Sequence, residues 1–191
     1  MFKGERVSMV SRQLSAARWR PLRAGLALPH APTLHAWLGS AASLTRRLQQ
    51  ACGSETLQVR LLQQQWRLVT APELAPFARA VPRRMLQREV LLCCGEQPWV
   101  YAVTLLPVAT LRHSQWQFGR LGARPLGALL FADPTLWRGG VEVTRVTMAR
   151  AGEGWRQGER LWARRSLFRR GGWPLLVSEL FLSAAPCYGD R

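Results

Sequence analysis

Hydrophobic residues in the first third of the chain follow a helical spacing. Between residues 33 and 48 they recur at intervals of three and four positions, which predicts one amphipathic helix. The residues on this face are Leu34, Trp37, Leu38, Ala41, Ala42, Leu44 and Leu48. Residues 1–31 are basic and show no such pattern. We therefore expect residues 1–31 to be a basic, mobile N-terminal extension, and residues 32–191 to form a single domain.

Most of the remaining apolar positions indicate strands. Extended segments are predicted at residues 56–62, 65–70, 86–94, 99–106, 141–149, 159–169 and 174–182. Short helices are predicted at residues 107–116 and 125–131, and the proline-rich residues 71–85 have the character of a long connection or lid. Helices followed by consecutive short strands favour an α+β fold with an antiparallel sheet.

The composition is that of a folded and strongly basic protein. Of 191 residues, 48% are hydrophobic, and the 27 Lys and Arg residues exceed the 11 Asp and Glu residues by 16. A chain of this size can bury a core that needs no disulfide or structural metal. Lys3 is the only lysine, and the arginines are spread along the whole chain. The charge predicts an anionic partner. Nucleic-acid binders more often concentrate their charge on one helix or arm. The charge alone therefore indicates no narrower class of partner, and nucleic acid is not among the partners that we expect.

The cysteines and histidines do not have the spacing of metal ligands. The four cysteines are Cys52, Cys93, Cys94 and Cys187. None forms a C-x-x-C pair, and the adjacent Cys93 and Cys94 would point to opposite faces of a strand. We interpret all four as reduced and mostly packed in the core, and we expect no bound metal, because the three histidines are scattered as well.

No targeting or membrane segment is evident in the sequence. No apolar run approaches the ~20 residues that span a bilayer, and the N-terminus lacks the apolar core of a secretory signal. We therefore expect a cytoplasmic protein without an integral membrane segment.

Two charged residues fall on apolar faces of predicted strands. In residues 174–182 the period of two places Glu179 among hydrophobic neighbours, and in residues 86–94 it does the same for Arg88. A buried carboxylate has a raised pKa that suits proton transfer, and a buried guanidinium can hold a carboxylate through two hydrogen bonds. Two other interpretations stay open. Glu179 could form a structural ion pair or reach water at a sheet edge, and Arg88 could simply pair with Glu179 or Glu89.

The other arginines on the predicted strands do not indicate a functional site. The run Arg164-Arg165 and Arg169-Arg170 is most simply an exposed strand and turn. The common nucleotide-binding and hydrolase motifs, G-x-x-x-x-G-K-[ST], G-x-G-x-x-G and G-x-S-x-G, are absent from the sequence.

Three segments resemble the chorismate lyase family. They are R-E-V-L-L-C-C-G-E-Q-P-W-V-Y-A-V-T-L-L-P-V-A-T-L from Arg88, L-G-A-R-P-L-G-A-L-L-F from Leu121, and W-A-R-R-S-L-F-R-R-G-G-W-P-L-L-V-S-E-L-F-L from Trp162. The likeness runs in order from about Trp37 to Tyr188. It implies an enzyme that eliminates pyruvate from chorismate to give 4-hydroxybenzoate, the first committed step of ubiquinone biosynthesis, as a monomer without metal or organic cofactor.

The resemblance also implies a fold and a set of site residues. The fold would be an antiparallel sheet with helices on one side and flap-like loops over an internal cavity. Arg88 and Glu179 would be catalytic and would bind substrate and product, and Leu44 and Leu126 would contribute backbone contacts. One position departs from the family, because Val103 stands where an arginine often precedes the threonine.

Two rival functions remain at this stage. A related fold serves as the effector-sensing domain of some transcription regulators, so a non-catalytic domain that senses small carboxylates is the main alternative. Such regulators carry a DNA-binding domain of ~60–70 residues, and the 31 residues before the predicted helix are too few for one. A basic nucleic-acid binder is the third choice, and its affinity would fall steeply with salt.

Overall fold

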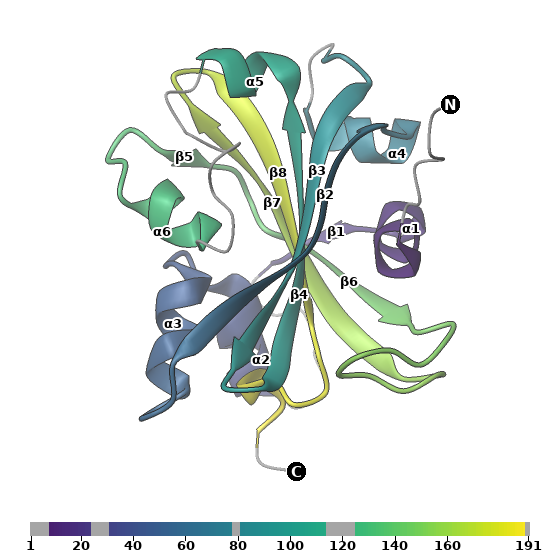
Figure 1. The fold of residues 1–191 in the computed structure, drawn as a ribbon, viewed down its shortest axis with the longest axis vertical. Helices are drawn as coiled ribbons and strands as arrows, with labels where there is room; N and C mark the ends of the chain where they lie inside the picture. The colour runs from purple at the N-terminus through teal and green to yellow at the C-terminus, as the bar shows by residue number, and fades with distance from the viewer. Residues whose placement is uncertain (1–7, 24–30, 78–80, 114–124, 190–191) are drawn as a thin grey trace.

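The computed structural model describes residues 8–23, 31–77, 81–113 and 125–189, which form one antiparallel sheet with flanking helices (Figure 1). The strands are β1 (Arg20–Pro21), β2 (Leu57–Leu68), β3 (Arg84–Cys94), β4 (Gln97–Pro107), β5 (Trp137–Arg138), β6 (Glu142–Thr147), β7 (Arg160–Arg170) and β8 (Trp173–Phe181). Their order is β1-β6-β7-β8-β4-β3-β2, and β5 also pairs with β7. The predicted α+β class with an antiparallel sheet is confirmed.

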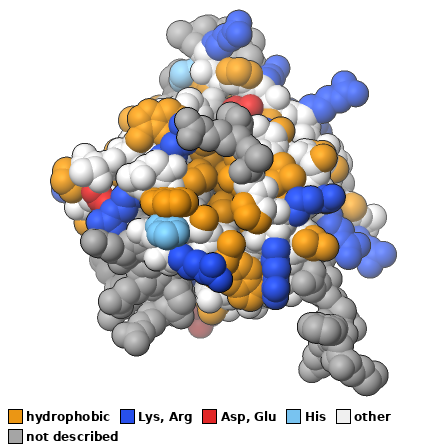
Figure 2. All heavy atoms as spheres, turned by 90° about the horizontal axis from the view of Figure 1, so that it is seen from above, with side chains coloured by type: hydrophobic (Ala, Val, Ile, Leu, Met, Phe, Trp, Pro, Cys, Tyr) orange, Lys and Arg blue, Asp and Glu red, His pale blue; other side chains and the backbone are white. Residues whose placement is uncertain are grey.

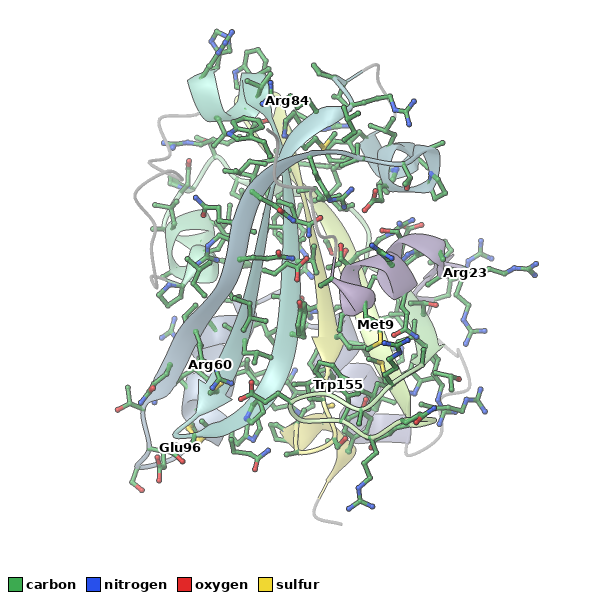
Figure 3. All side chains as sticks on the ribbon, turned by 45° about the vertical axis from the view of Figure 1, so that its right-hand side comes forward. Met9, Arg23, Arg60, Arg84, Glu96 and Trp155 are labelled. Carbon is green, nitrogen blue, oxygen red and sulfur yellow. A yellow bond between two sulfur atoms is a disulfide. The ribbon has the colours of Figure 1, made fainter. Side chains whose placement is uncertain are left out.

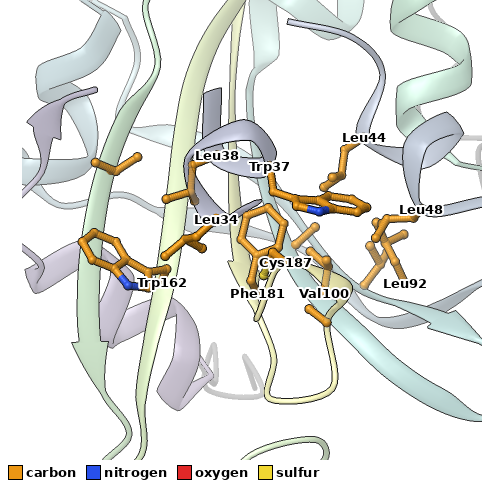
Figure 4. Close-up of a cluster of buried hydrophobic side chains, with 14 residues drawn as sticks. Leu34, Trp37, Leu38, Leu44, Leu48, Leu92, Val100, Trp162, Phe181 and Cys187 are labelled. Atoms are coloured by element: carbon orange, nitrogen blue, oxygen red, sulfur yellow. The ribbon is translucent and has the colours of Figure 1, made fainter. Parts of the chain in front are cut away.

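Helices lie on both faces of this twisted sheet. The α-helices are α1 (Met9–Ala16), α2 (Ala31–Gly39), α3 (Leu44–Ala51), α4 (Ala71–Leu74), α5 (Val108–His113) and α6 (Leu126–Phe131), with 3-10 turns η1 (Ala75–Phe77) and η3 (Pro186–Tyr188). Side chains of α2 and α3 pack on Leu92 of β3 (Figure 4) and on Val90 of the same strand. Helix α1 packs instead on Leu91 and Cys93. Because neighbouring residues of a strand point to opposite faces, these helices cover opposite faces. The one-sided helix layer expected from the resemblance is therefore wrong.

Several predicted element boundaries are also wrong. The single helix predicted at residues 33–48 is two helices, α2 and α3, because the chain breaks after Gly39 and Ser43 caps α3 by accepting the Arg46 N–H at 3.4 Å. The two strands predicted at residues 56–62 and 65–70 are one strand, β2, whose register shifts between Leu61 and Gln63. Most other strands lie within a few residues of their predicted positions. The last residues of the helix predicted at 107–116 lie outside the described part of the chain.

The N-terminal residues that we expected to be irregular contain regular structure. Ser8 caps helix α1 by accepting the Ser11 N–H at 3.1 Å, and Val10 and Leu14 of this helix are buried against the sheet. Strand β1 then pairs with β6. The sequence lacked the signal because α1 has only two turns and buries a narrow apolar face.

The cysteines differ from the expectation that all four are reduced. Cys52, directly after α3, forms a disulfide with Cys94 at the end of β3, with a Cα–Cα distance of 5.6 Å. Cys93 and Cys187 are free and buried, as predicted. Cys93 packs under α1 on the opposite face from the disulfide, so the predicted opposite orientation of Cys93 and Cys94 is confirmed. The disulfide links the end of α3 to the turn end of the β3–β4 hairpin.

Exposed arginines lie at widely separated places on the molecule. Arg23, Arg60 and Arg84 are exposed and extend from different regions of the fold (Figure 3). The view from above shows arginine side chains distributed around exposed apolar groups (Figure 2). This distribution agrees with the even spacing of arginines along the sequence.

Replacing Cys52 by Ser tests the disulfide. The bond closes a loop of 42 residues, so its loss should lower the free energy of unfolding by about 3 kcal/mol under non-reducing conditions. Denaturant unfolding with and without a reducing agent measures the effect. Reductant should destabilise the unaltered protein and leave Cys52→Ser unchanged. Equal stability of both proteins in the absence of reductant would contradict the bond.

Candidate functional site

The sheet register places the predicted charged residues on one face, the one covered by α2, α3 and α6. Two rows of paired residues cross this face; one runs Arg88, Thr104, Val177, Ser166, and the next runs Val90, Ala102, Glu179, Arg164. Arg88 and Glu179 therefore lie two strands apart in adjacent rows. Neighbouring strands are about 4.8 Å apart, so their backbones are separated by roughly 10 Å across the sheet. Both side chains line the same pocket, so the two charges face one hollow from different strands.

All four site residues expected from the resemblance line one pocket. Leu44, Arg88, Leu126 and Glu179 contribute to its wall. The enclosed volume is about 50 Å³, well below the ~300–1,000 Å³ that is usual for ligand sites. The internal cavity expected from the resemblance is thus only a small hollow, and side chains or covering segments must move to admit a ring.

The described part of residues 71–85, the segment expected to be a connection or lid, does not cover this hollow. Residues 71–77 form α4 and η1 on the opposite face of the sheet, where Phe77 packs on Met85 of β3. Residues 78–80 lie outside the described part of the chain. None of the described residues of 71–85 lines the pocket.

Glu179 is held by a buried arginine that the sequence analysis placed on the surface. Arg164 Nε donates to Glu179 Oε2 at 2.5 Å, and the side chains are 2% and 16% exposed, respectively. The expectation of an exposed strand is therefore wrong for Arg164. Glu179 does form an ion pair, as one of the open interpretations held, but it also lines the pocket.

Arg164 also caps the C-terminal end of α2. Its Nη1 donates to the carbonyl oxygens of Trp37, Leu38 and Ser40 at 2.9, 3.2 and 3.3 Å. The last carbonyls of a helix have no partner within it and carry partial negative charge, so a guanidinium is well placed there. Burial of this arginine is thus balanced by one carboxylate and three carbonyl oxygens.

Arg88 faces the pocket and is 4% exposed. Its pKa is lowered from the ordinary value because burial disfavours the charged form. Glu89 is on the opposite face of β3, where it accepts hydrogen bonds from the Gln87 amide and the Tyr101 hydroxyl. The interpretation that Arg88 pairs with Glu89 is therefore wrong, since the two side chains point away from each other.

The position of Val103 explains why its departure from the family does not alter the pocket wall. Val103 packs with Val10 and Leu14 of α1 on the face opposite the pocket. Its neighbours Ala102 and Thr104 line the pocket instead. An arginine at position 103 would point away from the pocket, toward α1.

Leu44 and Leu126 occupy equivalent positions in two different helices. Each is the first residue of a helix, Leu44 of α3 and Leu126 of α6. The N–H groups of a first helical turn have no acceptor within the helix and are available to a ligand. The two helices approach closely, because a Cβ atom added at Gly127 would lie 2.6 Å from Thr45 Oγ1. The backbone contacts expected at Leu44 and Leu126 therefore fall at helix starts that line the pocket.

Arg138 is a pocket residue that the sequence analysis missed. It lies in the two-residue strand β5, lines the pocket and donates to Ser166 Oγ at 3.1 Å and to the Ser40 carbonyl at 2.8 Å. Burial, together with the nearby charge of Arg164, lowers its pKa to about 10. Two residues are too few to show a period, so no alternation could mark Arg138 as inward-facing.

The charges at the pocket favour an anionic ligand. Arg88, Arg138 and Arg164 line it, and among the described lining residues Glu179 is the sole carboxylate. No cluster of three or more potential metal ligands occurs in the described ranges. None of the described helices is long and apolar enough to cross a bilayer.

Comparison with known structures identifies the same fold in domains of transcription regulators. The ligand-binding domain of a GntR-family regulator from Bordetella bronchiseptica is 16% identical, with a TM-score of 0.51 over 68% of this chain and 86% of that domain. The PhnF C-terminal domain is 12% identical, with a TM-score of 0.53 over 71% of this chain and 88% of that one. At such low identity the likeness establishes the fold alone.

Sequence comparison gives a more specific result. The protein named chorismate pyruvate-lyase in Erwinia tasmaniensis is 37% identical over 179 residues, covering 93% of this chain and 92% of that protein. The protein of the same name in Escherichia coli O1:K1 is 37% identical over 158 residues, covering 82% and 87%. A family model described as chorismate lyase matches residues 13–190. The chain belongs to the chorismate lyase family.

Proposed function

We propose that the protein is a chorismate pyruvate-lyase, which eliminates pyruvate from chorismate and leaves 4-hydroxybenzoate, the ring precursor of ubiquinone. The observation that carries this proposal is membership of the chorismate lyase family over residues 13–190. The pocket supports it, because Arg88 and Glu179 stand on the same sheet face and line the same hollow.

The reaction needs no external oxidant or cofactor. Chorismate carries a ring carboxylate, a hydroxyl group and, on the carbon next to the hydroxyl carbon, an enolpyruvyl ether. The ring loses the hydrogen of the hydroxyl-bearing carbon, and the ring carbon–oxygen bond of the ether breaks. The enolpyruvyl group gains that hydrogen and leaves as pyruvate. The ring becomes aromatic, which supplies the driving force.

We assign Arg88 to the ring carboxylate and Glu179 to the ring hydroxyl. A guanidinium binds a carboxylate through two charge-assisted hydrogen bonds, which would fix the direction of the ring. Arg164 on strand β7 holds Glu179 by donating to its Oε2 atom. Oε1 of Glu179 can then accept a hydrogen bond from the ring hydroxyl. The N–H groups of Leu44 and Leu126 would add oriented dipoles at the helix side of the pocket.

Two routes remain for the hydrogen transfer. Glu179 could take the ring hydrogen as a base and return it to the leaving group. The hydrogen could instead pass directly to the methylene of the enolpyruvyl group, with Glu179 only polarising the adjacent carbon through the hydroxyl. In either route Glu179 touches the substrate beside the reacting carbon.

The alternative function is a domain that senses a small carboxylate without converting it. The fold shared with the ligand-binding domain of a GntR-family regulator supports this alternative. Incubation of the purified protein with chorismate and a chelator separates the two functions. The lyase forms equimolar 4-hydroxybenzoate and pyruvate, measured by ultraviolet absorbance and a pyruvate assay, whereas a sensing domain binds and releases chorismate unchanged.

Replacing Arg88 by Ala should abolish tight binding of 4-hydroxybenzoate. Loss of a buried partner for a carboxylate costs about 2 kcal/mol or more, so the dissociation constant should rise at least ~30-fold. Isothermal titration measures it, and Arg60→Ala, which removes an exposed arginine of strand β2, serves as the control. Similar dissociation constants for the Arg88 and Arg60 variants would remove Arg88 from the site.

Replacing Glu179 by Gln should reduce turnover more than stability. The amide keeps the size and one acceptor oxygen, and Arg164 keeps its three carbonyl partners, so the melting temperature should fall by only a few degrees. The kcat for chorismate should drop ~100-fold or more, as is usual when a group that moves or orients a proton is lost. A kcat within about threefold of the unaltered protein would refute the role of Glu179.

A further inference from the structure

The proposed assignment leaves the second carboxylate of the substrate without a partner. Chorismate is a di-acid, and Arg88 accounts only for the carboxylate on the ring. The carboxylate of the enolpyruvyl group stands beside the ring hydroxyl, so it lies at the Glu179 end of the pocket. We propose, on the basis of the proposed function, that Arg138 binds this second carboxylate and thereby distinguishes substrate from product.

Arg138 reaches the pocket from the side opposite Arg88. The row that begins at Arg88 ends at Ser166 of β7, and Ser166 Oγ accepts from Arg138 Nε at 3.1 Å. Three strand spacings separate Arg88 from Ser166, roughly 14 Å across the sheet. Two long side chains that enter from the ends of this row leave a space between them, floored by Thr104 and Val177.

The Glu179 end of the pocket carries a net positive charge, because Arg138 and Arg164 face the single carboxylate of Glu179. The Ser40 carbonyl accepts from both Arg138, at 2.8 Å, and Arg164, at 3.3 Å, so one neutral oxygen joins the two guanidinium groups. Burial and the charge of Arg164 lower the pKa of Arg138, and the charge of Glu179 acts against them. A carboxylate placed there would reduce the repulsion between the two arginines.

Arg164 and Arg138 differ in what they can offer a ligand. Arg164 is bound to Glu179 and to the three carbonyl oxygens at the end of α2. Arg138 donates to two neutral oxygens, packs 5.3 Å from the Phe168 ring, and forms no ion pair with an Asp or Glu in the described ranges. A ligand carboxylate could therefore pair with Arg138, whereas Arg164 is already paired with Glu179.

Arg138 should act on the substrate and not on the product. 4-Hydroxybenzoate has a single carboxylate, which Arg88 is assigned to bind, and it lacks the enolpyruvyl group. A residue that holds only the departing group adds to the affinity for chorismate and leaves the affinity for product unchanged. A purely structural role, in which Arg138 ties the segment after α2 to β7, would affect both ligands alike.

The test compares the two ligands in Arg138→Gln and Arg138→Lys. In Arg138→Gln we expect the KM for chorismate to rise ~30-fold or more, as for the loss of a buried charge partner. The dissociation constant of 4-hydroxybenzoate should stay within about threefold, and Arg138→Lys should recover at least part of the affinity for chorismate. Arg160→Gln, which removes an exposed arginine at the start of β7, controls for the loss of one positive charge.

The outcomes separate this inference from the proposed function. Equal loss of both ligands in Arg138→Gln, or an unchanged KM for chorismate, would overturn the role of Arg138 while the lyase activity of the unaltered protein stands. If the unaltered protein releases no pyruvate, the proposed function fails. Dissociation constants for chorismate and 4-hydroxybenzoate then provide the same comparison, and loss of chorismate binding alone still supports a carboxylate site at Arg138.

Discussion

The buried pair of Arg164 and Glu179 joins the fold to the candidate site. A carboxylate in an apolar sheet face is costly unless it has a charged partner, and Glu179 has one in Arg164 at 2.5 Å. The same guanidinium satisfies the carbonyl oxygens at the end of α2. The end of α2 and the site therefore share one side chain. Removal of Arg164 would leave both a buried carboxylate and a helix end without partners, so a stability loss there would obscure any effect on chemistry.

Period-two alternation was sufficient to predict the inward direction of Arg88 and Glu179, because each strand continues for several residues on both sides of the charge. The same rule places Arg164 on the face of Trp162 and Ser166, so the signal for its burial was present. The adjacent Arg165 obscured it, since a pair of arginines in a basic chain is typical of an exposed strand. Arg165 in fact pairs with Glu142. Arg138 had no such signal, because β5 contains two residues and its burial comes from pairing with β7.

The parts of the fold that sequence could not predict depend on contacts between distant segments. The break between α2 and α3 interrupts a continuous apolar spacing, and it is stabilised by the arginines that bind the Ser40 carbonyl from β5 and β7. The disulfide joins residues 42 positions apart. Helix α1 is held on the far face partly by a hydrogen bond from Ser11 to Gln87, which lies next to Arg88 in β3. None of these partners is adjacent in the chain, so no local pattern could indicate them.

The shared fold does not by itself separate a carboxylate sensor from a lyase. In the proposed site, a group that binds the ring carboxylate holds substrate and product equally, and such uniform binding lowers KM without accelerating the chemical step. It also retains the product after pyruvate leaves. In the proposed site, acceleration depends on the group beside the reacting carbon, which is Glu179 at the hydroxyl. Discrimination of substrate from product depends on Arg138 at the enolpyruvyl carboxylate, which the product lacks. A sensing domain needs only the contact with the ring carboxylate. The contacts proposed for Glu179 and Arg138 are thus the part of this pocket that would separate a lyase from a sensing domain.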